Sequence, residues 1–218
     1  MSQCESARSR DVGRRRSRTG SLVRCTPGAW GVTVCAVSLP AREHRTVPHS
    51  GGVSDEEFRG ALSRLAAGVV LVTAHDDEDG PHGAPAGMTA TAFMSVSLDP
   101  PLVLVGVRTG SRMDEVLERR PLWAASLLGD SHRATAGRFA MKGRLSDRLV
   151  FRDVPHRLGE VTGAPLLTDA LATVECATEQ RVAAGDHTLV IGRVLAAELP
   201  ATGAGPLLYY RSSYRSLG

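Results

Sequence analysis

The sequence predicts a mainly β domain, built as a closed barrel with a few peripheral helices. Several segments have the period-two pattern or the continuous apolar run of a strand, only three have helical spacing, and the two kinds do not alternate as βαβ units. Of the 218 residues, 42% are hydrophobic, which is enough for a packed core. No run approaches the roughly 18 apolar residues of a membrane-spanning helix, so we expect no membrane association.

The N-terminal 53 residues differ from the rest in charge. Residues 1–50 hold nine arginines and three acidic residues, whereas the remaining chain holds 17 basic and 20 acidic residues. A nucleic-acid-binding fold carries its positive charge on the folded body, so we expect no nucleic-acid partner beyond what a basic arm could touch. Arg14-Arg15-Arg16 would suit a twin-arginine export signal, but Arg24 and Pro27 interrupt the apolar segment. We interpret residues 1–53 as a disordered basic N-terminal extension, or the product of a start codon set too far upstream, and 54–218 as the folded domain.

Cysteine usage indicates a reducing compartment. Cys4, Cys25 and Cys35 lie in the extension, Cys176 stands alone in the domain, and there is no C-x-x-C pair. Neither a zinc site nor a disulfide framework is supported. We therefore expect a cytoplasmic protein without a bound metal.

The domain begins with a capping box. Ser54 can cap a helix, Glu57 can reach back to it, and apolar residues follow at helical spacing, which predicts a helix over 55–66. Gly68 ends this helix, and residues 69–74 have the continuous apolar pattern of a strand buried on both faces. A turn is predicted next, at 79–81.

Five further strands and two further helices are predicted. The strands are 88–93, 102–107, 122–128, 172–182 and 187–199, the last with a bend or bulge at Gly192. The helices are 111–119, capped by Ser111, and 130–141, capped by Asp130.

Motifs for the common chemistries are absent from the sequence. It has no Gly-rich dinucleotide fingerprint after a strand, no phosphate-binding P-loop, no H-E-x-x-H and no G-x-S-x-G. His75 and His82 flank the acidic run 76–79, which could mimic a metal site but is more typical of a solvated hairpin tip. We therefore expect neither a catalytic dyad nor a metal centre.

Two segments are not explained by packing alone. Residues 87–101 interleave small and hydroxylated side chains where a core strand would place Val or Ile, and residues 185–194 place His187 after a Gly-Asp turn. Small side chains let a flat ligand approach the backbone, whose amides can bond to the ligand's edge. The alternative is a strand whose small residues make room for a neighbouring helix, and the pattern favours neither.

Together these segments resemble the flavin reductase family, short-chain NAD(P)H:flavin oxidoreductases that supply two-component monooxygenases. The resemblance rests on Gly87-Met88-Thr89 with Phe93-Met94-Ser95-Val96-Ser97-Leu98-Asp99-Pro100-Pro101, on Gly185-Asp186-His187 with Gly192, and on Pro206-Leu207-Leu208-Tyr209-Tyr210-Arg211. It runs from Ser54 to Leu217 in the family's order and spacing, and residues 1–53 fall outside it.

The resemblance implies an FMN-binding split β-barrel, usually a homodimer with the flavin near the subunit interface. Carried over residue by residue, it places the flavin of FMN or FAD against Thr89, Ala90, Thr91, Ala92, Ser97, Phe139 and Ala140. Backbone amides of the first four would bond to the carbonyl and N5 edges of the ring. The structural alternative for Phe139 is the buried face of its helix. The sequence departs from the family at Ser126, where relatives often have Asn, and at Thr91-Ala92, where many have two Ser.

The resemblance also implies a phosphate end and a nicotinamide end. Arg108, Ser111 and Arg112 match the family's phosphate-side segment, and the residues agree: Ser111 opens a predicted helix whose free amides favour an anion, and the arginines add charge. The alternative is a solvated loop. His187 matches the family histidine beside the nicotinamide of NADH or NADPH; the alternative is an exposed histidine at a strand end.

The activity implied is direct hydride transfer from C4 of NADH or NADPH to N5 of the flavin, after which reduced flavin leaves for a monooxygenase partner. The flavin and nicotinamide supply the electronics, which agrees with the missing dyad. Two other classes stay open. A non-catalytic flavin- or haem-binding split-barrel protein would keep the barrel and lose the role of His187. An enzyme like pyridoxamine-phosphate oxidase shares the barrel, but the matching phosphate region has few basic residues.

Overall fold

The computed structural model describes residues 22–27, 33–38, 52–76, 83–141, 143, 146–200 and 203–217. It divides into two compact units, residues 1–52 and 53–218. In the first unit, β1 (Leu22–Pro27) and β2 (Thr33–Ser38) pair antiparallel, with Leu22 opposite Ser38. Most of the extension predicted to be disordered, and the turn predicted at 79–81, lie outside the described residues.

The second unit begins with α1 (Asp55–Leu62). The predicted capping box is confirmed: Ser54 Oγ accepts the Glu57 N–H at 3.2 Å, and Glu57 Oε2 accepts the Ser54 N–H at 3.0 Å. The helix ends at Leu62 rather than at residue 66, because the Ser63 hydroxyl donates to the Gly60 carbonyl and competes with helical pairing. None of the residues of α1 is buried.

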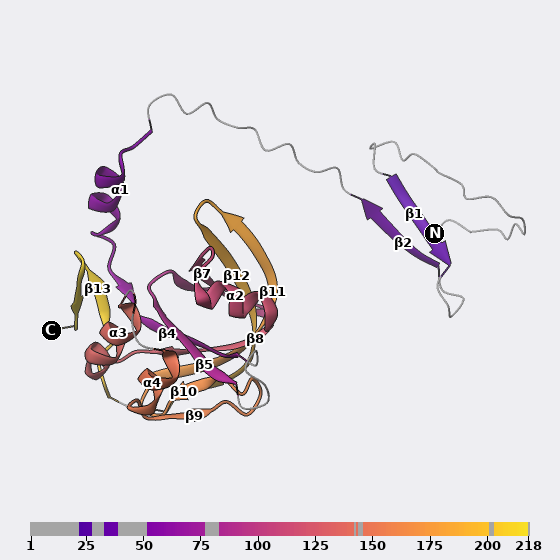
Figure 1. Cartoon of the computed structure of the whole chain (residues 1–218). Helices are drawn as coiled ribbons and strands as arrows, with labels where there is room; N and C mark the ends of the chain where they lie inside the picture. The colour runs from indigo at the N-terminus through magenta and orange to yellow at the C-terminus, as the bar shows by residue number, and fades with distance from the viewer. Residues whose placement is uncertain are drawn as a thin grey trace, which may run out of the picture. The chain divides into compact units, whose positions relative to one another are not determined.

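One seven-stranded antiparallel sheet forms the body of this unit (Figure 1). Its strands lie in the order β5-β4-β8-β11-β12-β7-β6. They are β4 (Val70–Asp76), β5 (Ala84–Ala90), β6 (Phe93–Leu98), β7 (Pro101–Arg108), β8 (Leu122–Leu127), β11 (Ala172–Ala184) and β12 (His187–Glu198). Every residue of β4 except His75 is buried, which confirms the predicted strand with two covered faces.

The sheet is not closed among the described strands, so the closed barrel predicted from the strand pattern is wrong: β5 and β6 are its two edges. Only Thr91 and Ala92 separate these edges along the chain, and three peptide steps span at most about 11 Å. The opposite edges therefore meet at one corner, beside which the β6–β7 pairing extends by one bond, from the Gly106 N–H to the Ala92 carbonyl at 2.9 Å. A sheet that curls until its edges meet without pairing is a split barrel, as the resemblance implied. The strand predicted over 88–93 is consequently the end of one strand and the start of another.

Helices pack against this sheet (Figure 1). They are α2 (Arg112–Arg119), α3 (Arg133–Ala140), which the 3₁₀ helix η1 (Asp130–His132) precedes, and α4 (Asp147–Arg152). Ser111 caps α2 as predicted. The helix predicted over 130–141 is two pieces, and Asp130 does not cap it; the Gly129 N–H instead donates to His132 Nδ1 at 3.1 Å. Among the described residues, no helix has the length and apolarity to cross a membrane.

Two small sheets and α4 were not predicted. β9 (His156–Leu158) pairs with β10 (Pro165–Leu167), and β13 (Leu208–Tyr210) pairs with both β14 (Ser213–Arg215) and β3 (Ala67–Gly68). The second of these sheets brings the C-terminal segment against the start of the domain.

Two apolar clusters form most of the core. One surrounds Trp123, and the other contains Phe139 and Phe151, whose ring centroids are 4.8 Å apart. Gly192 leaves room for Trp123, because a Cβ there would lie 2.4 Å from Trp123 Cζ2. Opposite Gly192, β11 shifts register between Thr178 and Gln180, so the irregularity predicted at this glycine is confirmed.

Candidate functional site

The corner between β5 and β6 presents its backbone to solvent. β5 pairs with β4 as far as Ala90, and β6 pairs with β7 from Phe93, with one further bond from the Gly106 N–H to the Ala92 carbonyl. The N–H groups of Thr91 and Ala92 therefore lie outside both ladders. Both residues are exposed. Their amides are not engaged in sheet pairing, which is what a ligand that bonds to backbone edges requires.

A cavity of about 150 Å³ opens beside this corner. Its lining residues are Val69, Thr89, Ala90, Thr91, Ala140, Tyr209 and Tyr214. Residues 89–91 and Ala140 were predicted from the sequence as site residues, and Val69 and the two tyrosines were not. Tyr209 reaches the cavity because β13 pairs with β3, placing Tyr209 opposite Ala67. The one sequence signal for it was the Tyr-Tyr pair in the segment that carries the resemblance.

The cavity lining fits a planar aromatic ligand. The rings of Tyr209 and Tyr214 meet edge to face, with centroids 5.4 Å apart. Burial raises the pKa of Tyr214, and the neighbouring Tyr209 adds to the effect, so Tyr214 is a neutral aromatic surface at physiological pH. Short side chains on β5 leave the approach to the backbone open. An isoalloxazine ring would find a flat apolar face here and amides at its edge.

A second group of predicted residues lies at the adjoining ends of β7 and β12. Arg108 ends β7, two residues beyond the glycine that bonds to Ala92, and His187 begins β12 directly opposite Arg108. His187 Nδ1 lies 2.7 Å from Asp186 Oδ1. That hydrogen bond, followed by the charge of His187, lowers the pKa of Asp186. This exposed end carries an arginine and a histidine, which suits an anionic or amide-bearing ligand.

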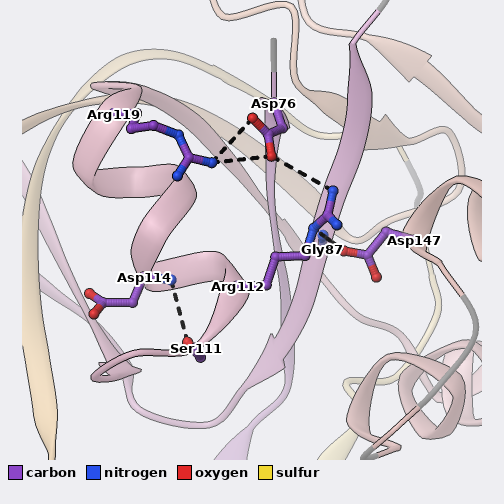
Figure 2. Close-up of polar contacts among 7 residues, drawn as sticks. All are labelled: Asp76, Gly87, Ser111, Arg112, Asp114, Arg119 and Asp147. Carbon is purple, nitrogen blue, oxygen red and sulfur yellow. Dashed lines mark hydrogen bonds and ion pairs between the residues drawn. The ribbon is translucent and has the colours of Figure 1, made fainter. Parts of the chain in front are cut away.

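Figure 2 shows where the structure places Arg112. Its guanidinium lies between two buried carboxylates, 3.7 Å from an oxygen of Asp76 and 3.7 Å from one of Asp147. Arg119 contacts both oxygens of Asp76 at 3.3 Å, and Asp147 accepts the Gly87 N–H at 3.2 Å. The network therefore ties α2 and α4 to β4 and β5. No local pattern indicated that Arg112 would share its charge with two carboxylates.

The remaining predicted residues lie outside the cavity lining. Ser97 is in β6 beside a register shift, Ser111 caps α2, and Phe139 is buried beneath β5. A Cβ on Gly87 would lie 2.8 Å from Phe139 Cε1, so the small residue there makes room for α3. The structural alternative weighed for 87–101 thus applies at Gly87, whereas residues 89–91 line a cavity.

Two other polar residues of the domain have internal contacts. Ser126 Oγ accepts the Leu167 N–H at 3.1 Å, which joins β8 to β10. Cys176 is fully buried, and this burial, followed by the Glu175 carboxylate, raises the pKa of its thiol to about 12. A thiol of that kind is unreactive at neutral pH. Among the residues that the structure describes, no group of three His, Cys, Asp or Glu could hold a metal ion.

The fold and the cavity define a split-barrel protein with a cavity beside the corner where its two edges meet. Comparison with known proteins makes this specific: residues 62–218 match the flavin reductase like domain. An NADH-dependent flavin reductase of Rhodococcus sp. is 40% identical over 167 residues, covering 76% of this chain and 88% of that protein. An NADH:riboflavin 5'-phosphate oxidoreductase of Streptomyces pristinaespiralis is 36% identical over 169 residues, covering 78% and 92%.

Solved structures agree with the sequence relatives. The styrene monooxygenase flavin reductase of Pseudomonas putida S12 superposes with a TM-score of 0.63 at 34% identity, covering 74% of this chain and 97% of that one. The chain therefore belongs to the flavin reductase family, and the resemblance stated from its motifs is confirmed.

Proposed function

We propose that this protein is an NADH-dependent reductase of FMN that supplies reduced flavin to a monooxygenase. The observation that carries the proposal is the cavity beside Thr91 and Ala92, where small side chains, unengaged amides and two tyrosines gather at the meeting of the sheet edges. The relatives' names support both NADH and flavin as reactants.

The reaction moves a hydride from C4 of NADH to N5 of the flavin, and a solvent proton completes the reduced flavin. The protein's part is to hold two planar rings in contact and to keep water and oxygen out. We assign the ring to Thr89, Ala90, Thr91, Ala92 and Ala140, with Ser97 and Phe139 supporting the strand and helix around it. No side chain has to accept or donate a proton in the transfer, which agrees with a cavity lined by alanines, threonines and tyrosines.

We assign the charged end of the site to Arg108, Ser111, Arg112 and His187. Arg108 and the amides that follow Ser111 would receive the flavin phosphate, and His187 would hold the nicotinamide carboxamide or a phosphate of NADH. Arg108 and His187 are paired across β7 and β12 and are both exposed, which supports a shared role. Arg112 would serve the phosphate only in part, because it already lies between Asp76 and Asp147.

We further propose that the protein works in the cytoplasm as a homodimer, with residues 1–53 as a basic N-terminal extension outside the catalytic domain. Met94, Val96 and Leu98 are exposed apolar residues of the edge strand β6, a position at which a second copy could cover them. The interface would then adjoin the flavin corner. Reduced flavin must pass to the monooxygenase, so binding at this corner has to be reversible.

The experiment is steady-state oxidation of NADH by the full chain, with FMN varied at saturating NADH and NADH varied at saturating FMN. We expect Ala140→Leu to raise the KM for FMN by about tenfold, because the added atoms occupy the cavity. His187→Ala should raise the KM for NADH while leaving that for FMN within about twofold. The control is Ala197→Leu, an exposed alanine of β12 outside the cavity lining, which should behave as wild type. Bound flavin with no NADH oxidation would instead identify a non-catalytic flavin-binding protein.

A further inference from the structure

Asp114 of α2 is a buried carboxylate that the proposed mechanism does not use. Only 7% of the residue is exposed. In Figure 2 its side chain points away from the cluster formed by Asp76, Arg112 and Asp147, so it belongs to a different part of the structure. One oxygen accepts the Gly110 N–H at 2.9 Å, and the other accepts Arg181 Nη2 at 2.6 Å.

These two contacts join segments that are far apart in the sequence. Gly110 belongs to the loop between β7 and α2, and Arg181 belongs to β11, three residues before the end of that strand. β11 and β12 form the long hairpin whose tip carries His187. Figure 1 shows this hairpin as two orange strands that curve beside α2.

The same loop and hairpin meet at two further points. The Thr109 N–H donates to the Asp186 carbonyl at 3.0 Å, and the hydroxyls of Thr109 and Thr188 are 3.4 Å apart. Both points lie next to His187. The contacts of Thr109 with the hairpin involve neutral groups, whereas the contact of Asp114 with Arg181 joins two charged side chains.

The pair of Asp114 and Arg181 is largely removed from water. Arg181 has a side-chain exposure of 24%, and its Nη1 is buried with no partner among the described residues. Burial by itself would raise the pKa of Asp114, but the Gly110 N–H, Arg181 and the Thr188 hydroxyl outweigh it, so the net shift lowers the pKa. Asp114 is therefore ionised at neutral pH, and removing either partner leaves a shielded charge uncompensated.

We infer that Asp114 is a positioning residue for the nicotinamide half of the site: it anchors the β11–β12 hairpin, through Arg181, to the Gly110 loop and so holds His187 beside the flavin. This inference rests on the proposed role of His187. Without the anchor, the hairpin tip would keep its pairing with β7 and the contacts of Thr109 but would lose its ionic link to α2, and His187 would sample positions that do not meet NADH.

The test compares Asp114→Asn and Arg181→Met in steady-state kinetics. Asparagine keeps one carbonyl oxygen for the Gly110 N–H, but the –NH2 group that replaces the other oxygen donates and cannot accept from the Arg181 guanidinium, so this change removes the side-chain ion pair with the hairpin and keeps the contact with the loop. We expect either variant to raise the KM for NADH by about five- to twentyfold, to lower kcat less than that, and to leave the KM for FMN within about twofold. The double variant should be no worse than the single ones, and Arg181→Lys should recover part of the affinity for NADH.

The matched control is Glu118→Gln, an exposed carboxylate on the same helix, which should leave all three constants unchanged. Amide hydrogen exchange at residues 183–187 should be faster in Asp114→Asn and Arg181→Met than in wild type or the control. If Asp114→Asn does not fold, Arg181→Met decides, because it alters only the hairpin side of the pair.

The outcomes separate the two claims. An increased NADH KM in His187→Ala, with wild-type kinetics and exchange in both anchor variants, would overturn the positioning role and leave the proposed function intact. An unchanged NADH KM in His187→Ala would overturn the nicotinamide assignment itself. A loss of FMN affinity equal to the loss of NADH affinity in Asp114→Asn would also contradict the inference, since it would indicate a general loosening of the domain.

Discussion

Strands β5 and β6 follow one another in the sequence and have similar compositions of small, hydroxylated and apolar residues, yet they lie at opposite edges of the sheet. β5 is covered on both faces, with Ala86 and Ala90 buried on one and Gly87 buried on the other. β6 is exposed along most of its length, and Leu98 is 94% exposed. Similar sequences therefore form a buried strand, β5, before the two-residue corner and a solvent-exposed strand, β6, after it.

The difference teaches that small residues here have three separate causes. Gly87 is small because the rings of Phe139 and Phe151 lie against it. Residues 89–91 are small because a cavity opens there, and Ser95 and Ser97 are tolerated because β6 meets solvent. Each cause can be tested by a substitution that matters on one side of the corner and not on the other.

The largest expected effect is at the packed strand. Gly87→Ala places a Cβ 2.8 Å from Phe139 Cε1 and 3.0 Å from Phe151 Cζ, and overpacking of this kind costs about 1–3 kcal/mol. We expect the free energy of unfolding, measured by urea denaturation, to fall by that amount. Gly137→Ala is the control, because nothing lies within 4 Å of its Cβ position in α3; alanine there should stabilise the helix by about 0.5–1 kcal/mol. Equal stability of the two variants would contradict the packed environment of β5.

An intermediate effect is expected at the exposed strand. Val96→Asp puts a charge in the middle of β6, where it meets water in a monomer but an apolar partner in the proposed homodimer. We expect self-association, measured by sedimentation equilibrium, to weaken by about tenfold or more, with little change in the unfolding of the monomer. Leu199→Asp, at another exposed apolar residue, is the control. A dimer that tolerates the charge on β6 would place the interface elsewhere.

The smallest effect concerns the tyrosine that borders the β5 side of the corner. The folded-state pKa of Tyr214 is raised above its ordinary value of 10.0, because burial and then Tyr209 disfavour the phenolate. The resulting stability is present below pH 10 and is lost as the pH rises through the folded-state value. We expect the melting temperature of the wild type to fall more between pH 9 and pH 11 than that of Tyr214→Phe. An equal fall in the melting temperature of Tyr214→Phe would show that another titratable group causes the alkaline loss of stability. That group would not be in β6, which has no titratable residue.

Local signals in the sequence predicted the elements that depend on few residues. Residues close together in the sequence indicate the capping box at Ser54, the buried strand β4 and the Ser111 cap, and the glycine itself indicated the irregularity at Gly192. The break at Thr91-Ala92 was not visible, since nothing in the local pattern distinguishes a corner from a continuous strand. It follows from where β4 and β7 end their pairing with β5 and β6.

Some residues of the candidate site could likewise be predicted from the sequence, and others could not. Motif resemblance located Thr89, Ala90, Thr91 and Ala140, which do line one cavity. Tyr214 was missed because it reaches the cavity only through the pairing of β13 with β3 and β14. The ion pairs of Arg112 were missed for a related reason. Its partners Asp76 and Asp147 come from β4 and α4, and one sequence does not show which distant carboxylates lie beside a guanidinium in the fold.

The short link from Ala90 to Phe93 also limits how far the two edges of the sheet can separate. A split barrel whose two edges are joined at one point can open only away from that point. The covalent chain through Thr91 and Ala92 supplies this junction between β5 and β6. Widening of the gap between β5 and β6 is therefore expected to be smallest at this corner and greatest at the far ends of the two strands, so that thermal fluctuation of the sheet leaves the geometry of the proposed flavin site intact.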